Sequence, residues 1–415
     1  MNARTDLPGP LRRRGPRPLW LHLMLATQPS TAWRSVLQTW SAGSPPSAPP
    51  PEGQTLLTPD PALLAGVAAY RRHPWHRTLI DPPAIWSEGS TRLLDYGPQD
   101  RGDQDRGTKD RGTKDRGVQD RGPGAGQPVL FVPSLVNRAY VLDLAEGRSM
   151  LRWLAAQGVR PLLLDWGWPE DTERRFNLTD YVAGRLERAM TAAARLAGPP
   201  VLAGYCMGGT LAVAAAQRRP DLIRGLALLA APWDFHAPDA GRAIQAAEML
   251  PLLEPALTFS RALPVDLLQS LFAMLDPWGV ADKYRGFARL PPESPRARLF
   301  VALEDWLNDG VPLAADVARA CLGEWYGENA PARGTWRIAG LPVDPAAIAM
   351  PTFVAVPGRD RIVPPESARP LAHLIPNATL HQPAAGHIGM TAGARAELSL
   401  WRPLLNWLGT LKAAE

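Results

Sequence analysis

Short apolar runs alternate with amphipathic stretches through most of the chain after residue 126. Asp180–Leu196, for example, places Val182, Leu186 and Met190 on one face at helical spacing and ends at Gly198. The six runs expected to be strands are Pro128–Val132, Val159–Leu164, Pro200–Ala203, Leu226–Ala231, Thr352–Val356 and Thr379–Gln382. Because strands that alternate with helices need crossover connections, the pattern predicts an α/β fold with a mostly parallel sheet covered by helices on both faces.

Three other segments complete the predicted organisation. Asp60–Tyr70 has helical spacing, and Ala84–Tyr96 contains two short apolar runs split by Glu88 and Gly89, as in a hairpin. Phe235–Leu341 is helical and rich in proline. We expect this segment to be a helical cap, inserted after the sixth strand above the carboxyl edge of the sheet.

Two stretches have no apolar period. Ser41–Pro51 is rich in Ser, Pro, Ala and Gly and is predicted to be a linker. An Asp-Arg-Gly-x-x repeat that begins at Asp100 and ends at Gly122 is predicted to be a solvated loop. The predicted divisions are residues 1–83 (arm, linker and helix), 84–127 (hairpin and repeat loop), 128–235 (core, first part), 236–340 (cap) and 341–415 (core, second part).

Composition narrows the classes of function. With 46 % apolar side chains, the 415 residues can bury a core, which excludes wholesale disorder. The 45 basic residues (41 Arg and 4 Lys) and 40 acidic residues are interspersed, and no basic cluster is interleaved with aromatics, so we do not expect nucleic acid as a partner. The two cysteines, Cys206 and Cys321, cannot build a disulfide framework, so a reducing, cytoplasmic location is expected.

The N-terminal part gives a weak targeting pattern. Arg12, Arg13 and Arg14 precede the apolar run Leu19–Ala26, as in a short signal peptide, but His22 interrupts the run and no small-residue cleavage site follows it. We therefore do not expect export. No stretch approaches the ~18 uninterrupted apolar residues of a spanning helix, so an integral membrane protein is not expected.

Val201–Ala216 carries the strongest chemical motif. An apolar run leads into Gly-Tyr-Cys-Met-Gly-Gly, starting at Gly204, and directly out into an Ala-rich stretch, which is the pattern of a nucleophile elbow with Cys206 where hydrolases usually carry Ser. The glycines allow the helix to pass close to the strand. The helix N-terminus favours a thiolate on Cys206, and the Met207 backbone N–H would point at an acyl oxyanion. These features predict a covalent nucleophile rather than a buried structural cysteine.

An acid and a histidine follow in the chain order that such a nucleophile requires. Asp360 lies in a turn after the predicted strand Thr352–Val356, and His387 lies in a small-residue loop after Thr379–Gln382. Both loops are expected at the carboxyl edge of the sheet, beside Cys206. The sequence therefore predicts a Cys-His-Asp triad.

Other candidate residues are weaker. His73 and His76 have a metal-like spacing, but Pro74 bends the pair and no second cluster of ligands follows, so we expect packing or surface contacts and no metal. Cys321 lies on a helical stretch beside Ala320 and is expected in the core.

The motifs together resemble those of the polyhydroxyalkanoate synthases, a family of the α/β-hydrolase superfamily that uses Cys in a Gly-x-Cys-x-Gly-Gly box. The run Asp165–Pro169, with Asp180 and Tyr181 downstream, is similar to the two-subunit class of synthase. The resemblance covers residues 128 to 236 and 335 to 390, and its other matching segments are Val129–Leu144, Val343–Asp344, Asp360–Pro364 and Gly386–Gly389.

The resemblance implies an α/β-hydrolase fold and an acyltransferase that polymerises (R)-3-hydroxyacyl-CoA to a polyester with release of CoA. It implies no cofactor beyond the coenzyme A thioester, which is the substrate. Cys206 would take the acyl group, His387 would deprotonate Cys206 or the incoming hydroxyl, and Asp360 would orient His387. By position, the turn Pro133–Asn137 would supply a second oxyanion donor, the backbone of Val136.

Alternatives stay open at this level. A Cys-dependent hydrolase, either a thioesterase or a polyester depolymerase, could use the same triad, and a catalytically idle granule-binding protein could carry the same fold. The resemblance also leaves open whether the chain forms a homo-oligomer or needs a partner synthase subunit, and whether it lies at the surface of polyester granules.

Overall fold

The computed structural model describes residues 12–29, 57–97, 126–273 and 277–411, which form two compact units. Unit 1 contains residues up to 77 together with 266–309, and unit 2 contains 78–265 and 310–415. The predicted linker at 41–51 and the repeat at 100–122 lie outside the described residues. Among the helices described, none combines the length and the apolar character that crossing a bilayer requires.

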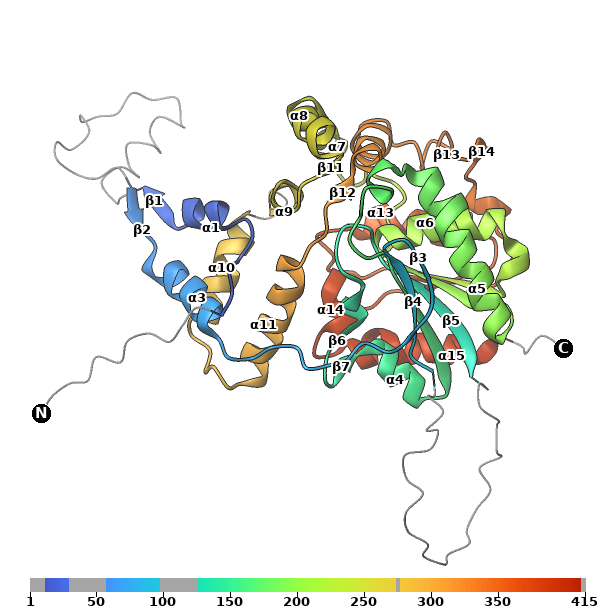
Figure 1. Ribbon diagram of the computed structural model, residues 1–415, viewed down its shortest axis with the longest axis horizontal. Helices are drawn as coiled ribbons and strands as arrows, with labels where there is room; N and C mark the ends of the chain where they lie inside the picture. Colours follow the sequence, from blue (N-terminus) through green and yellow to red (C-terminus); the bar gives the residue numbers. More distant parts are fainter. Residues whose placement is uncertain (1–11, 30–56, 98–125, 274–276, 412–415) are drawn as a thin grey trace, which may run out of the picture. The chain divides into compact units, whose positions relative to one another are not determined.

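Unit 2 is built on an eight-stranded sheet with the order β16-β15-β10-β9-β5-β8-β4-β3 (Figure 1). Every neighbouring pair from β8 to β16 is parallel, whereas β4 is antiparallel to both β8 and β3. The strands are β3 (Ala84–Glu88), β4 (Thr91–Asp95), β5 (Gln127–Val132), β8 (Val159–Asp165), β9 (Val201–Tyr205), β10 (Gly225–Leu229), β15 (Thr352–Ala355) and β16 (Ala378–His381). The predicted mostly parallel sheet and its hairpin are confirmed.

Helices cover both faces of this sheet. Figure 1 shows α5 (Glu187–Ala197) and α6 (Met207–Arg218) on one side, with α4 (Met150–Ala156) and α15 (Arg402–Thr410) on the other. The predicted helix that ends at Gly198 is present, but its first part, Asp180–Leu186, is a π-helix (η3). Two further helices follow the last two strands, α13 (Pro365–Leu374) and α14 (His387–Ala392).

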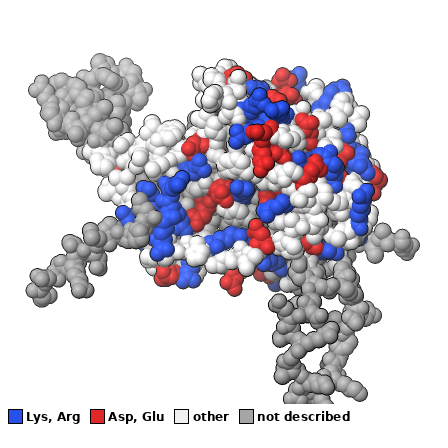
Figure 2. All heavy atoms as spheres, viewed as in Figure 1, with Lys and Arg blue, Asp and Glu red and all other residues white. Residues whose placement is uncertain are grey.

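Several arginines of unit 2 pair with carboxylates, some of which are buried. Figure 2 shows Lys and Arg side chains intermixed with Asp and Glu over the face in view. Asp95 and Asp143 are both less than 10 % exposed and accept from arginines at 2.7 and 2.8 Å. These arginines therefore serve local ion pairing in unit 2.

The segment predicted as one cap follows the sixth strand of the sheet, β10, as expected, but the structure divides it between the units. Residues 236–265 and 310–340 stay in unit 2, and 266–309 belong to unit 1. The elements of this segment that belong to unit 2 are α7 (Ala240–Glu248), α8 (Leu250–Ser260), β11 (Ala262–Leu263), β12 (Leu313–Ala314), α12 (Ala315–Arg319), the π-helix η5 (Ala320–Gly327), β13 (Arg337–Ile338) and β14 (Leu341–Pro342).

A close helix–helix contact explains this division. The helix α3 (Pro61–Arg72) packs on α10 (Pro277–Phe287), and a Cβ added at Gly66 would overlap the carbonyl group of Tyr284. The two helices can therefore approach only because position 66 lacks a side chain. Leu63, Val67 and Tyr70 of α3 join Tyr284 and Phe287 of α10 in one buried apolar cluster.

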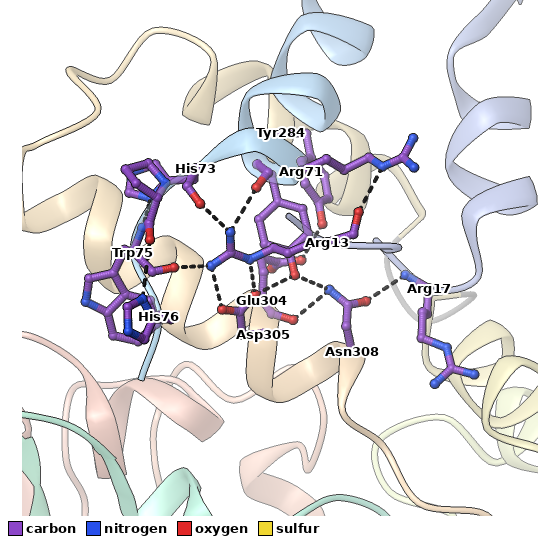
Figure 3. A network of polar contacts seen from close by, with 12 residues as sticks. Arg13, Arg17, Arg71, His73, Trp75, His76, Tyr284, Glu304, Asp305 and Asn308 are labelled. Carbon is purple, nitrogen blue, oxygen red and sulfur yellow. Dashed lines mark hydrogen bonds and ion pairs between the residues drawn. The ribbon is translucent and has the colours of Figure 1, made fainter. Parts of the chain in front are cut away.

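Unit 1 also contains α1 (Leu19–Leu25), β1 (Thr27–Pro29), β2 (Leu57–Pro59) and α11 (Pro295–Asn308). Arg13, from the basic triplet, is 11 % exposed and lies at the centre of the polar network in Figure 3. Its guanidinium donates to both carboxylate oxygens of Asp305 and to the backbone oxygens of Tyr70, His73 and Trp75. The pattern that is similar to a signal peptide thus lies in a packed part of unit 1.

Candidate active site

The Cys206 turn has the backbone geometry of a nucleophile elbow. Cys206 lies between β9 and α6 with φ 55° and ψ −132°, in the left-handed region that few residues other than glycine adopt. A Cβ at Gly204 would lie 2.6 Å from the Gly208 carbonyl oxygen, and a Cβ at Gly208 would overlap the Val132 carbonyl oxygen. Both glycines are therefore required for the helix to pass so close to the strands.

The other two predicted triad residues meet at the same edge of the sheet. Asp360 follows β15, and its Oδ1 accepts the backbone N–H groups of Ile362 at 2.8 Å and Val363 at 2.9 Å. His387 follows β16 and begins α14. Its Nδ1 donates to Asp360 Oδ2 at 2.6 Å. The backbone contacts fix the carboxylate, and the carboxylate in turn fixes the orientation and tautomer of the imidazole.

His387 also lies close enough to Cys206 for the cysteine to act on its pKa. His387 and Asp360 are 7 % and 5 % exposed, while Cys206 is partly accessible. Burial lowers the pKa of His387, but the Cys206 thiolate and the bond to Asp360 outweigh it and raise the pKa to about 10. The structure thus brings the three predicted residues together at one edge of the sheet.

The two predicted oxyanion donors differ in their surroundings. Met207 is the first residue of α6, where a backbone N–H has no partner within the helix and the helix dipole favours negative charge. Val136 follows β5, but its N–H donates to Ser134 Oγ at 3.1 Å. Val136 would have to release Ser134 before binding an oxyanion. Both roles stay predictions.

Sequence reasoning missed two aromatic residues at this edge. Tyr205, directly before the nucleophile, donates its hydroxyl to the His387 carbonyl oxygen at 3.3 Å, and the two rings lie 5.1 Å apart. Tyr326, on η5, is close enough to Cys206 for the thiolate charge to act on its hydroxyl. The only sequence signal for Tyr205 is its position beside the elbow, whereas Tyr326 lies more than a hundred residues away and carries none.

The weaker candidates lie elsewhere. Burial raises the pKa of the Cys321 thiol well above its ordinary value, which keeps it protonated and unreactive. His73 Nε2 donates to the Pro292 carbonyl oxygen at 2.8 Å, and exposed His76 faces the backbone of Pro74. Within the described ranges, no three His, Cys, Asp or Glu side chains are grouped as a metal site requires.

Comparisons with known proteins agree with the fold. Residues 127–393 match the family described as alpha/beta hydrolase fold. The chain is 32 % identical to the poly(3-hydroxyalkanoate) polymerase subunit PhaC of Haloferax mediterranei, over 68 % of this chain and 58 % of that protein. It is 29 % identical to the subunits of the same name from Allochromatium vinosum and Synechocystis sp., over 68 % of this chain and 80 % and 77 % of those proteins.

The chain thus spans little more than half the length of the Haloferax mediterranei relative. The match to the fold family covers the strands from β5 to β16 and the loops that carry Asp360 and His387. The chain therefore belongs to the α/β-hydrolase fold family, and within that family it is similar to poly(3-hydroxyalkanoate) polymerase subunits.

Proposed function

We propose that this chain is an acyltransferase that polymerises (R)-3-hydroxyacyl-CoA to a polyester and releases CoA. The observation that carries the proposal is the meeting of Cys206, His387 and Asp360 at the carboxyl edge of the sheet, with His387 Nδ1 bonded to Asp360 Oδ2. The similarity to named polymerase subunits supplies the substrate class.

In the first step, the Cys206 thiolate attacks the thioester carbonyl carbon, and a new C–S bond forms. Negative charge moves onto the carbonyl oxygen, beside the Met207 N–H and the N-terminus of α6. When the intermediate collapses, the bond to the CoA sulfur breaks and the leaving thiolate takes the proton held by His387. The acyl group is then a thioester of Cys206.

In the second step, neutral His387 accepts the proton of an incoming hydroxyl, whose oxygen attacks the acyl carbon of Cys206. The ester bond forms, the C–S bond breaks, and the thiolate is restored beside the imidazolium. A cysteine suits this exchange because its acyl thioester keeps enough energy to be passed to an alcohol. Asp360 matters most here, since an alcohol is harder to deprotonate than a thiol.

The test is incubation of the purified chain with 3-hydroxybutyryl-CoA, with measurement of free CoA and of product mass. We expect high-mass polyester from the wild type. Cys206→Ala should lower the rate of CoA release by at least about a thousandfold, with the fold retained, because the covalent step is lost. Cys321→Ala is the matched control and should retain the rate.

Free CoA accompanied only by monomeric hydroxy acid would contradict polymerisation and leave a thioesterase or a depolymerase on the same triad. Release of CoA that survives in Cys206→Ala would contradict the assigned nucleophile.

The location and partners belong to the same proposal. We infer a cytoplasmic enzyme that works at the surface of its polyester. Because the relatives are named subunits, the assay is run with the chain alone and with a partner synthase subunit added. Light scattering of the purified chain measures whether it is a homo-oligomer.

A further inference from the structure

The loop that follows β10 hydrogen-bonds the nucleophile turn and leads into the part of the cap that belongs to unit 2. The Cys206 N–H donates to the Leu229 carbonyl oxygen at 2.9 Å, at the end of β10. The Thr210 hydroxyl, from the first turn of α6, donates to the Pro232 carbonyl oxygen at 2.7 Å. These two hydrogen bonds therefore fix the position of the residues after Pro232 relative to Cys206.

This loop holds the π-helix η5 by three hydrogen bonds. Asn329 donates its side-chain amide to Asp234 Oδ1 at 2.8 Å, and its side-chain oxygen accepts the Phe235 N–H at 2.9 Å. His236 donates from Nε2 to the Tyr326 carbonyl oxygen at 2.9 Å. The backbone of Tyr326 is thus fixed to the same loop that is fixed to the nucleophile turn.

Aromatic packing fixes the ring as well. The Phe235 ring lies 5.1 Å from the Tyr326 ring, edge to face, and 5.2 Å from Trp325. Trp325 in turn packs on Trp336 at 5.3 Å. The Tyr326 ring is therefore packed among apolar rings, and its hydroxyl is the one polar group of its side chain.

The Tyr326 hydroxyl remains available to a ligand. In the described part of the chain no hydrogen bond to this hydroxyl is found; the polar contact of the residue is made by its backbone. Burial raises the pKa of Tyr326 well above its ordinary value, and the nearby Cys321 and Cys206 add to the shift. The group is therefore an O–H donor near Cys206 at any pH at which the protein works.

We infer that Tyr326 donates a hydrogen bond to the 3-hydroxyl oxygen of the acyl group on Cys206 and selects 3-hydroxyacyl over unsubstituted acyl thioesters. The inference rests on the proposed function. The carbonyl oxygen of the acyl group belongs at the N-terminus of α6, so the 3-hydroxyl is the remaining polar group of the acyl chain. A pocket built to bond a substrate hydroxyl discriminates strongly against an analogue that lacks it, because its own polar group is left unpaired.

The experiment compares 3-hydroxybutyryl-CoA with butyryl-CoA in the full-length chain. Acylation of Cys206 is followed in a single turnover by quenching and mass measurement of the acyl-enzyme, and the ratio of the two second-order rate constants is the readout. We expect Tyr326→Phe to lower this ratio by about tenfold or more, through a slower reaction of the hydroxyacyl thioester. Tyr181→Phe, which removes the hydroxyl of a core tyrosine 5 % exposed, is the matched control and should keep the ratio.

A second variant tests the placement of η5 rather than the hydroxyl. Asn329 has φ 54°, so Asn329→Gly keeps the backbone conformation and removes both side-chain bonds. We expect it to lower the ratio as well, with the phenol still present.

A ratio in Tyr326→Phe equal to that of the wild type, with acylation by both thioesters, overturns the inference. If Tyr326→Phe lowers the ratio while the wild type forms only monomeric product, the inference is supported and only polymerisation is contradicted. If neither thioester acylates the wild type, the inference and the proposed function are both overturned.

Discussion

The nucleophile turn of unit 2 and the Arg13 network of unit 1 are both buried arrangements of polar groups, but different contacts hold them. At the turn, Gly204 and Gly208 shape the backbone within a few residues of Cys206. In unit 1, Arg13 reaches Asp305, a residue 292 positions away, and three backbone carbonyls (Figure 3). The first depends on local steric rules and the second on the fold as a whole.

Gly208→Ala should have the largest effect on stability. The new Cβ would overlap the Val132 carbonyl oxygen and lie 2.5 Å from that of Pro133, so backbone must move. We expect a loss of more than about 3 kcal/mol in the free energy of unfolding of unit 2. Denaturant unfolding of the full chain, with hydrogen exchange in β9, measures it.

Gly409→Ala is the control, because a Cβ at that position of α15 meets nothing within 4 Å. It should leave stability unchanged or raise it by up to about 1 kcal/mol. Equal losses in the two variants would mean that the close approach at the turn is not what requires glycine.

Arg13→Ala should have the next largest effect, and it acts on unit 1. The substitution removes the charged partner of Asp305, which keeps only the Tyr70 hydroxyl, and one donor to each of three carbonyls, so we expect unit 1 to lose about 2–3 kcal/mol of stability. Hydrogen exchange in α3 and α11 reports unit 1 separately from unit 2. Arg17 pairs with Asp266, but their side chains are 40 % and 50 % exposed, so Arg17→Ala should cost less than about 1 kcal/mol. A similar cost for both arginines would contradict the network.

The stability contributed by the nucleophile turn should depend on pH, whereas that of the Arg13 network should not. The folded-state pKa of His387 is raised to about 10, above its unfolded value, so its contribution is complete below pH ~6.5 and is lost as the pH rises through 10. The stability difference between wild type and Asp360→Asn should therefore shrink by about 1–2 kcal/mol between pH 6.5 and 10.

The penalty of Arg13→Ala should stay constant over the same range, because arginine keeps its charge. Unfolding measured at the two pH values for both variants tests this contrast. A His387 contribution that grows with pH would contradict the assigned protonation.

The sequence predicted the features that local rules determine. Apolar runs and the hairpin marked all eight strands of the sheet, and the elbow glycines located Cys206 and α6. Asp360 and His387 could then be expected beside Cys206, because both residues follow strands of one parallel sheet.

The division of the cap could not be predicted in the same way. The apolar positions of α3 indicate that one face is buried, but they do not specify that α10 covers it. Tyr326 was missed for a similar reason: its position depends on Asn329 and His236, and on the loop after β10 that no local pattern connects to them.

The composition of unit 1 from two distant segments also determines when it can fold during synthesis. The ribosome completes α1 and α3 first and must then make all of residues 78–265 before α10 and α11 exist. At about 5–20 residues per second, this takes roughly ten to forty seconds. Throughout that interval the apolar face of α3, with Leu63, Val67 and Tyr70, lacks the helix that buries it. Unit 1 is therefore completed only after the nucleophile turn of unit 2 has been synthesised.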